Sequence, residues 1–134
     1  MSPLPVVLIG AGRRASAVYG PLLSRWMCDR VTLAGVIGRS EGRARALGEA
    51  LGVPWATDLG AASSMGARGA VVAVSSPENG RVARAVLDLG LPALLETPLA
   101  LDLAEARALA ARPGAIIEVA EQNPRFPDLA GVIA

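Results

Sequence analysis

The sequence predicts an α/β fold in which a doubly wound, mostly parallel sheet lies between two layers of helices. Short apolar runs alternate with helical segments of about ten residues along the whole chain. Several of these runs contain no polar residue, which is typical of strands buried on both faces. Strands joined through helices form right-handed βαβ units, and 134 residues are enough for one such domain with a real core.

The first unit is a strand, a helix and a second strand. Residues 5–9 form an apolar run that ends at Gly10, and residues 31–37 are rich in β-branched side chains. Between them, residues 15–25 carry apolar side chains at helical spacing. We therefore expect two neighbouring parallel strands with a helix that covers one face.

Shorter elements come next. Ser40 is placed to cap a helix that runs through Leu51, and Gly52 is placed to end it. Residues 53–56 predict a short third strand, and its proline favours a connecting or edge position. Residues 58–65 predict a short, weak helix.

The second half of the chain begins with another apolar run at residues 69–74. Ser76 supplies a capping hydroxyl directly before Pro77, and this pair is a favourable helix start. The helix is expected to run through Leu89, and Gly90 is placed to close it.

The last elements repeat the alternation. Residues 92–95 and 115–119 predict strands. Between them, Asp102 and Glu105 form a capping box for a helix that runs through Ala111.

Composition excludes several functions. The 13 basic residues, all of them arginine, nearly balance 12 acidic ones, which argues against nucleic acid or a membrane surface as the main partner. No uncharged apolar run approaches the roughly 20 residues of a membrane span. Without histidine or lysine the chain has no Ser-His-Asp triad and no histidine-based zinc site, so we expect no metal centre.

The single cysteine and the N-terminus bear on location. Cys28 cannot form an internal disulfide, and we expect it to pack in the core of a protein from a reducing compartment. No basic residue precedes the N-terminal apolar segment, which is the wrong order for an export signal. These observations favour a cytoplasmic protein. Tyr19 and Trp26 are expected to be packing residues of the first helix.

The turn after the first strand carries the first functional motif. Gly10-Ala11-Gly12-Arg13-Arg14-Ala15 fits the G-x-G-x-x-G/A fingerprint of dinucleotide-binding domains, at the strand-to-helix junction that the fingerprint requires. Gly10 permits the tight turn, Gly12 lets the backbone approach a pyrophosphate, and Ala15 lets the helix pack closely. The N–H groups that open the helix would bind the anion. The alternative is a glycine-rich turn that binds nothing.

The turn after the second strand indicates which dinucleotide binds. NAD-binding domains have an acidic residue there for the ribose 2′-hydroxyl, whereas this chain has Arg39 and Ser40, with Glu41 beyond them. A guanidinium pairs with a 2′-phosphate, which a carboxylate would repel. We therefore predict a preference for NADP(H) over NAD(H). The alternative is that Arg39 is an exposed loop charge and Ser40 only a helix cap.

Two more polar segments follow strands at the edge where open parallel sheets bind ligands. They are Ser75-Ser76-Pro77-Glu78-Asn79 after the fourth strand and Glu96-Thr97-Pro98 after the fifth. Glu96 interrupts an apolar stretch, and a carboxylate in such a place needs a partner. It is either a direct ligand contact or a structural carboxylate bonded to backbone N–H groups or an arginine.

These motifs and their spacing resemble one family of oxidoreductases. The matching segments are Gly10-Ala11-Gly12, Ser76-Pro77, Gly90-Leu91-Pro92-Ala93-Leu94-Leu95-Glu96-Thr97-Pro98 and Asn123-Pro124-Arg125-Phe126. They resemble the N-terminal domain of the glucose–fructose oxidoreductase/inositol dehydrogenase/rhizopine catabolism (Gfo/Idh/MocA) family. That family has a Glu-Lys-Pro signature after the fifth strand and often an Asn-x-Arg-aromatic motif after the sixth. The resemblance covers nearly the whole chain.

The resemblance implies a Rossmann-like, three-layer NAD(P)-binding domain at residues 1–120, with residues 121–134 starting the crossover toward a substrate domain that this chain lacks. Similar proteins transfer hydride between the nicotinamide and a sugar, a polyol or a related alcohol or carbonyl. The implied contacts are Gly10, Gly12, Arg13 and Arg14 at the pyrophosphate, Arg39 and Ser40 at the adenosine ribose, and Ser76, Pro77, Glu96 and Asn123 along the cleft. Ala11 and Ser75, in the same segments, complete the predicted cofactor-binding residues.

Two positions depart from the family's pattern. Thr97 replaces the signature lysine, which the family uses in proton transfer and substrate positioning. Thr97 is therefore the one candidate catalytic residue, and its hydroxyl supplies a hydrogen bond but no ammonium charge. Arg81 stands where the family commonly has a histidine.

The end of the chain and the absent domain leave three hypotheses. Residues 121–127 predict a polar loop and residues 128–134 a helix that has only begun, so we expect a truncated chain that binds NADP(H) without turnover. The second hypothesis is a stand-alone, non-catalytic nucleotide-binding or sensor module. The third is a remnant that forms a homo-oligomer, as a dimer, through the surface left by the absent domain.

Overall fold

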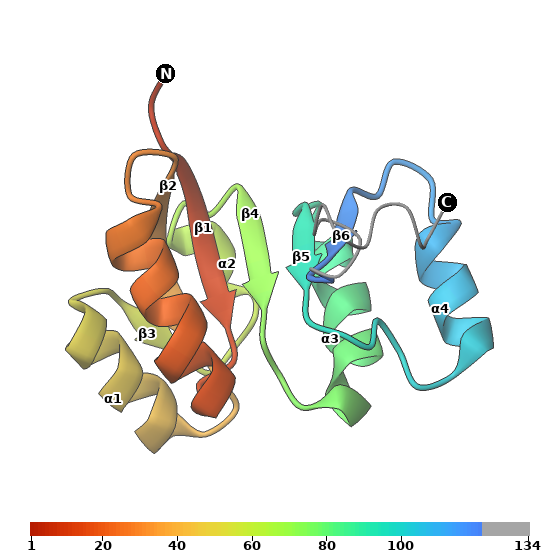
Figure 1. The fold of residues 1–134 in the computed structure, drawn as a ribbon, viewed down its shortest axis with the longest axis horizontal. Helices are drawn as coiled ribbons and strands as arrows, with labels where there is room; N and C mark the ends of the chain where they lie inside the picture. Colours follow the sequence, from red (N-terminus) through yellow and green to blue (C-terminus); the bar gives the residue numbers. More distant parts are fainter. Residues whose placement is uncertain (122–134) are drawn as a thin grey trace, which may run out of the picture.

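The computed structural model describes residues 1–121 and forms a parallel sheet in the order β3-β2-β1-β4-β5-β6 (Figure 1). Its strands are β1 (Leu4–Ile9), β2 (Val31–Ile37), β3 (Trp55–Ala56), β4 (Gly69–Val72), β5 (Ala93–Leu95) and β6 (Ile117–Val119). Every pair of neighbouring strands is parallel. The strand order reverses at β1, between β2 and β4, and a doubly wound sheet binds its ligand at this switch point. The predicted fold class is confirmed.

The helices cover both faces of the sheet. They are η1 (Ala15–Tyr19), η2 (Leu22–Trp26), α1 (Glu41–Leu51), α2 (Ala61–Ser64), α3 (Ser76–Asp88) and α4 (Leu103–Ala110). One buried cluster joins the sheet to α2, α3 and α4, and a second joins it to η1, η2 and α1. Figure 1 shows η1 and η2 in front of β1 and β2, with α3 and α4 beside β5 and β6. The predicted three-layer arrangement is therefore present.

The helix after β1 is wound more widely than an α-helix. Residues 13–26 are continuously helical, and η1 and η2 lie within them; together they are called the first helix below. The Gly20 N–H donates to the Ala15 carbonyl and the Met27 N–H to the Leu22 carbonyl, five residues back in both cases. Such π-helical turns are rare, and they occur frequently at functional sites.

Helix capping differs from the prediction in three places. Ser40 is the N-cap of α1, but its side chain makes no capping hydrogen bond. The N-cap of α3 is Ser75, one residue before the predicted Ser76. Asp102 accepts from the Ala104 N–H at 3.1 Å, but Glu105 pairs with Arg84, so the reciprocal half of the capping box does not form.

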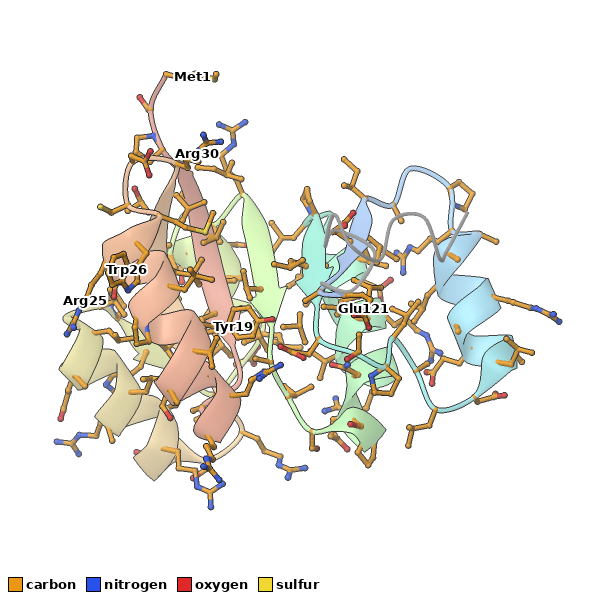
Figure 2. All side chains as sticks on the ribbon, viewed as in Figure 1. Met1, Tyr19, Arg25, Trp26, Arg30 and Glu121 are labelled. Atoms are coloured by element: carbon orange, nitrogen blue, oxygen red, sulfur yellow. The ribbon has the colours of Figure 1, made fainter. Side chains whose placement is uncertain are left out.

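Two packing predictions are wrong. Cys28 is exposed, and its Sγ lies 3.3 Å from the Arg25 carbonyl oxygen in the loop that ends the first helix. Trp26 is 78% exposed, because it lies on the last turn of that helix, beyond the part that packs on the sheet. Tyr19 is buried as predicted, and Figure 2 labels it near the middle of the molecule, beside β1 and β4.

No helix among residues 1–121 is long and apolar enough to cross a membrane. Residues 122–127 of the predicted polar loop, the predicted last helix and the candidate residue Asn123 lie outside the described residues.

Candidate functional site

A cleft of 520 Å³ opens at the carboxyl ends of β1, β2 and β4, at the switch point of the sheet. Six of the predicted cofactor-binding residues line it: Gly10, Ala11, Gly12, Arg39, Ser40 and Ser75. Its other polar lining residues are Arg43, Thr57, Glu78 and Arg81, and apolar side chains such as Leu59 and Val82 complete it. This volume lies within the usual range of small-molecule and cofactor sites.

The glycine turn has the geometry that the fingerprint predicts. Gly10 has φ +116°, and a Cβ there would lie 2.1 Å from the Ala73 carbonyl oxygen, so no other residue fits. A Cβ on Gly12 would meet no protein atom within 4 Å. The backbone at Gly12 is therefore open to the cleft, and a ligand can approach it closely.

The start of the first helix supplies hydrogen-bond donors to the cleft. The Ser16 N–H donates to the Gly12 carbonyl at 2.9 Å, which places the helix start at Gly12. The first N–H groups of a helix have no acceptor within the helix itself. They lie at the positive end of the helix dipole, which favours an anion at this turn.

The charges that line the cleft are mainly positive. Among its described lining residues, three arginines face one carboxylate, Glu78. Glu78 Oε2 accepts from Arg81 Nη2 at 2.5 Å and from Arg81 Nε at 3.0 Å, and it lies 4.0 Å from Arg39 Nη1. The hydrogen bond from Arg81 is the main reason that the pKa of Glu78 lies below its usual value. The cleft thus combines an anion-binding turn with guanidinium groups at one end.

Sequence reasoning missed part of this lining. Arg43 was not predicted, although it lies one helical turn after Arg39 and Ser40, and this spacing could have indicated it. Thr57 and Leu59 follow the short strand β3, and no motif marks them. They join the site only because β3 is the outer neighbour of β2.

Arg14 and Glu96 form a second polar group, outside the lining of the cleft. Arg14 Nε donates to Glu96 Oε1 at 2.8 Å, and the Tyr19 hydroxyl donates to the same oxygen at 2.6 Å. The Glu96 side chain is 13% exposed, whereas that of Arg14 is 62% exposed. Glu96 therefore has the arginine partner that one of its two predicted interpretations gives it.

The ionisation of this second group follows from its contacts. Burial alone would raise the pKa of Glu96, but the hydrogen bonds from Arg14 and Tyr19 outweigh it, and the pKa lies below its usual value. Burial is also the largest cause that raises the pKa of Tyr19, and the bond to Glu96 adds to it. Glu96 is therefore ionised and Tyr19 neutral at neutral pH.

The segment that follows β5 is anchored on its other side by α3. Asn79 is fully buried, and its Nδ2 donates to the carbonyl oxygens of Glu96 at 2.6 Å and of Pro98 at 2.7 Å. The Thr97–Pro98 peptide bond is cis, and Thr97 is exposed. Ser76, Pro77 and Thr97, like Arg13, do not line the cleft.

The sheet order, the glycine turn and the cleft at the switch point define a Rossmann domain of the dinucleotide-binding class. The model of the oxidoreductase family with an NAD-binding Rossmann fold, Gfo/Idh/MocA, matches residues 4–114. The chain belongs to this family, as the sequence resemblance predicted.

Solved structures extend the comparison. GenD2 from gentamicin A biosynthesis, in complex with NAD, is 27% identical with a TM-score of 0.85 and matches 98% of this chain and 38% of its own. KijD10, a 3-ketoreductase from Actinomadura kijaniata in complex with NADP, is 20% identical with a TM-score of 0.81 and matches 97% of this chain and 42% of its own.

A third similar structure is the UDP-N-acetylglucosamine 3-dehydrogenase GnnA from Acidithiobacillus ferrooxidans. It is 20% identical with a TM-score of 0.81, over 99% of this chain and 43% of its own. At this level of identity, KijD10 and GnnA show a common fold. The chain spans about two fifths of the length of each of these proteins. No curated protein sequence matches the chain.

Proposed function

We propose that the cleft binds NADP(H) in preference to NAD(H), and that residues 1–120 are the cofactor-binding domain of an oxidoreductase. The single observation that carries the proposal is the open backbone at Gly12 beside the first N–H groups of a helix. A pyrophosphate at this turn would meet no side chain where a Cβ of residue 12 would lie. When bound, the nicotinamide supplies the hydride chemistry, and the protein orients it.

The preference for NADP(H) is supported by the other end of the cleft. Arg39, Ser40 and Arg43 line it where β2 joins α1, and Arg81 lies across from them. The Ser40 hydroxyl makes no capping bond, so it is free to donate to a phosphate. Guanidinium groups at this place favour a 2′-phosphate over a bare ribose. Glu78 offsets part of this charge, since it pairs with Arg81.

The rest of the proposal concerns the reaction. A substrate domain, in the same polypeptide or another, would complete the enzyme, and the reaction would interconvert an alcohol and a carbonyl on a sugar, a polyol or a related compound. GenD2 comes from a pathway to gentamicin A, which supports a sugar-like substrate. We expect the chain alone to bind cofactor without turnover, because Thr97 is its one candidate catalytic residue.

A second candidate is a non-catalytic nucleotide-binding module. Thr97 favours it, because the position of the signature lysine holds an uncharged side chain. A comparison of the wild-type chain with its Thr97→Lys variant, each in the presence of a substrate domain, distinguishes the two. A dehydrogenase already active with threonine supports the enzyme, and activity that appears only with lysine supports the module.

The direct test is a calorimetric titration of NADPH and NADH into the purified chain and into its Arg39→Asp variant. We expect the wild-type chain to bind NADPH at low micromolar concentration and about 10-fold or more tighter than NADH, and we expect the variant to favour NADH. Arg45→Asp is the matched control, because Arg45 lies on α1 outside the cleft. No binding of either nucleotide at millimolar concentration would overturn the proposal.

A further inference from the structure

The segment Glu96–Thr97–Pro98, called the β5 turn below, is held from both faces of the sheet. On one face, Arg14 and Tyr19 of the first helix donate to the Glu96 carboxylate. On the other face, Asn79 of α3 donates to two carbonyl oxygens of the turn. Hydrogen bonds from two helices on opposite faces therefore fix the position of this turn.

The shape of the first helix is adapted to one of these anchors. Arg14 and Tyr19 are five residues apart, and in an α-helix such side chains point roughly 140° away from each other. In the wider winding of η1, where the Gly20 N–H bonds to the Ala15 carbonyl, they contact the same carboxylate oxygen. The π-helical turn of η1 therefore brings the Arg14 guanidinium and the Tyr19 hydroxyl to the same side of the helix, where both reach Glu96.

The side-chain amide group of Asn79 forms the second anchor of the turn. Both of its bonds to the β5 turn leave from Nδ2, and its Oδ1 has no hydrogen-bond partner among the described residues. A buried amide oxygen without a partner destabilises the fold. The residue is thus placed for what its N–H groups hold, the carbonyls on either side of Thr97.

The β5 turn lies where the far end of a dinucleotide would be. The arginines at the end of β2 would hold the 2′-phosphate, and the glycine turn after β1 would hold the pyrophosphate. In the strand order, β4 and β5 continue on the side of β1 away from β2. The nicotinamide end would therefore extend toward the carboxyl ends of β4 and β5.

We propose that Asn79, Arg14 and Tyr19 are positioning residues that hold the β5 turn against the nicotinamide end of the cofactor. Glu96 then acts by anchoring the turn, and its carboxylate does not contact the dinucleotide. This inference rests on the proposed function. It assigns to the two anchors a role in cofactor binding that is separate from the phosphate contacts.

The test compares NADPH with adenosine 2′,5′-bisphosphate, which carries the 2′-phosphate but no nicotinamide. Asn79→Asp replaces two N–H donors by an acceptor of the same shape, and Tyr19→Phe removes one hydroxyl. We expect each variant to bind NADPH about 3–10-fold more weakly than the wild-type chain. Each should bind the bisphosphate within about 2-fold of wild type, because the phosphate end of the cleft is untouched.

A matched pair of variants separates this role from general stabilisation. Arg14→Gln breaks the ion pair with Glu96, and Arg45→Gln breaks the pair with Glu49, which has a similar Nε–Oε1 distance of 2.9 Å and an equally exposed arginine. We expect Arg14→Gln to weaken binding of NADPH more than binding of the bisphosphate, and Arg45→Gln to change neither.

Each outcome is decisive. If the folded variants bind NADPH like wild type, or lose NADPH and the bisphosphate equally, the inference is wrong. If Asn79→Asp does not fold, Tyr19→Phe and Arg14→Gln decide alone. If the wild-type chain binds neither ligand, it is the proposed function that fails. If all three variants bind the bisphosphate and also keep the NADPH affinity of the wild-type chain, the proposed function stands. Asn79, Arg14 and Tyr19 then have no role in cofactor binding.

Discussion

Two glutamates at the carboxyl edge of the sheet have the same type of partner and different surroundings. Glu78 lies in the cleft, pairs with Arg81 and lies near Arg39. Glu96 lies outside the cleft lining and accepts from Arg14 and from the hydroxyl of buried Tyr19. Both carboxylates have a pKa below the usual value.

The surroundings of each ion pair, Glu78–Arg81 and Glu96–Arg14, determine whether its carboxylate can be exchanged for a ligand. The arginines beside Glu78 are well exposed, so a phosphate can replace the carboxylate as their partner at little cost. The Glu96 side chain has little contact with water. If it moved away from Arg14 and Tyr19, both hydrogen bonds would be lost without replacement by water. The same ion-pair chemistry therefore serves exchangeable binding at one site and fixed positioning at the other.

The largest expected effect concerns the glycine turn that follows β1. Gly10→Ala would place a Cβ against the Ala73 carbonyl at a positive φ, and we expect it to destabilise the fold by about 2–4 kcal/mol. Gly12→Ala is the control, since its Cβ meets no protein atom. It should change the stability by less than about 1 kcal/mol and weaken NADPH binding.

Chemical denaturation of both variants measures this difference. If Gly10→Ala and Gly12→Ala lost the same amount of stability, the turn at Gly10 would not lie in close contact with the end of β4.

The next effect concerns the pH dependence of the unfolding free energy, to which Glu96 should contribute more than Glu78. A carboxylate whose folded pKa is lowered stabilises the fold above its unfolded pKa, near 4.5, and this contribution is lost as the pH falls through the folded pKa. Glu96→Gln should therefore lower the stability at neutral pH, by about 1 kcal/mol, and flatten its decline in acid. Glu78→Gln should do so less, because water screens its pairs.

Unfolding free energies measured at neutral pH and at about pH 3 test this order. A larger effect of Glu78→Gln than of Glu96→Gln would contradict the comparison.

The smallest effect is spectroscopic and reports on the Glu96 group alone. Tyr19 is the one tyrosine of the chain, so its ionisation can be followed without overlap from another tyrosine by near-ultraviolet absorbance. Burial and the bond to Glu96 raise the pKa of Tyr19, so it should ionise well above a free tyrosine. Because Glu96→Gln removes the negative charge beside the hydroxyl, it should lower this pKa. An unchanged titration in that variant would show that the hydroxyl does not bond to Glu96 in solution.

Much of the fold could be predicted from the sequence because it depends on local patterns. The apolar runs, Gly52 and Gly90 place strands and helix ends within a few residues of where they lie. The first helix was predicted in position but not in winding, since apolar spacing does not distinguish a π-helical turn from an α-helical one. Trp26 and Cys28 were misplaced because hydrophobicity alone does not tell where a helix leaves the sheet.

The candidate site divides in the same way. Gly10, Gly12, Arg39 and Ser40 follow strands directly, and the topology alone brings such residues to one edge. The partner of Glu96 could not be chosen from the sequence, because thirteen arginines were available and the choice depends on tertiary packing.

The central claim is that the backbone N–H groups opening the first helix bind the pyrophosphate of NADPH. Backbone amide resonances of an isotope-labelled chain, followed during a titration with NADPH, test it directly. The account predicts saturable shifts at residues 11–14 and at Arg39 and Ser40, with small changes on α4. Saturating NADPH that leaves residues 11–14 unperturbed, or that shifts only residues remote from the cleft, would contradict it.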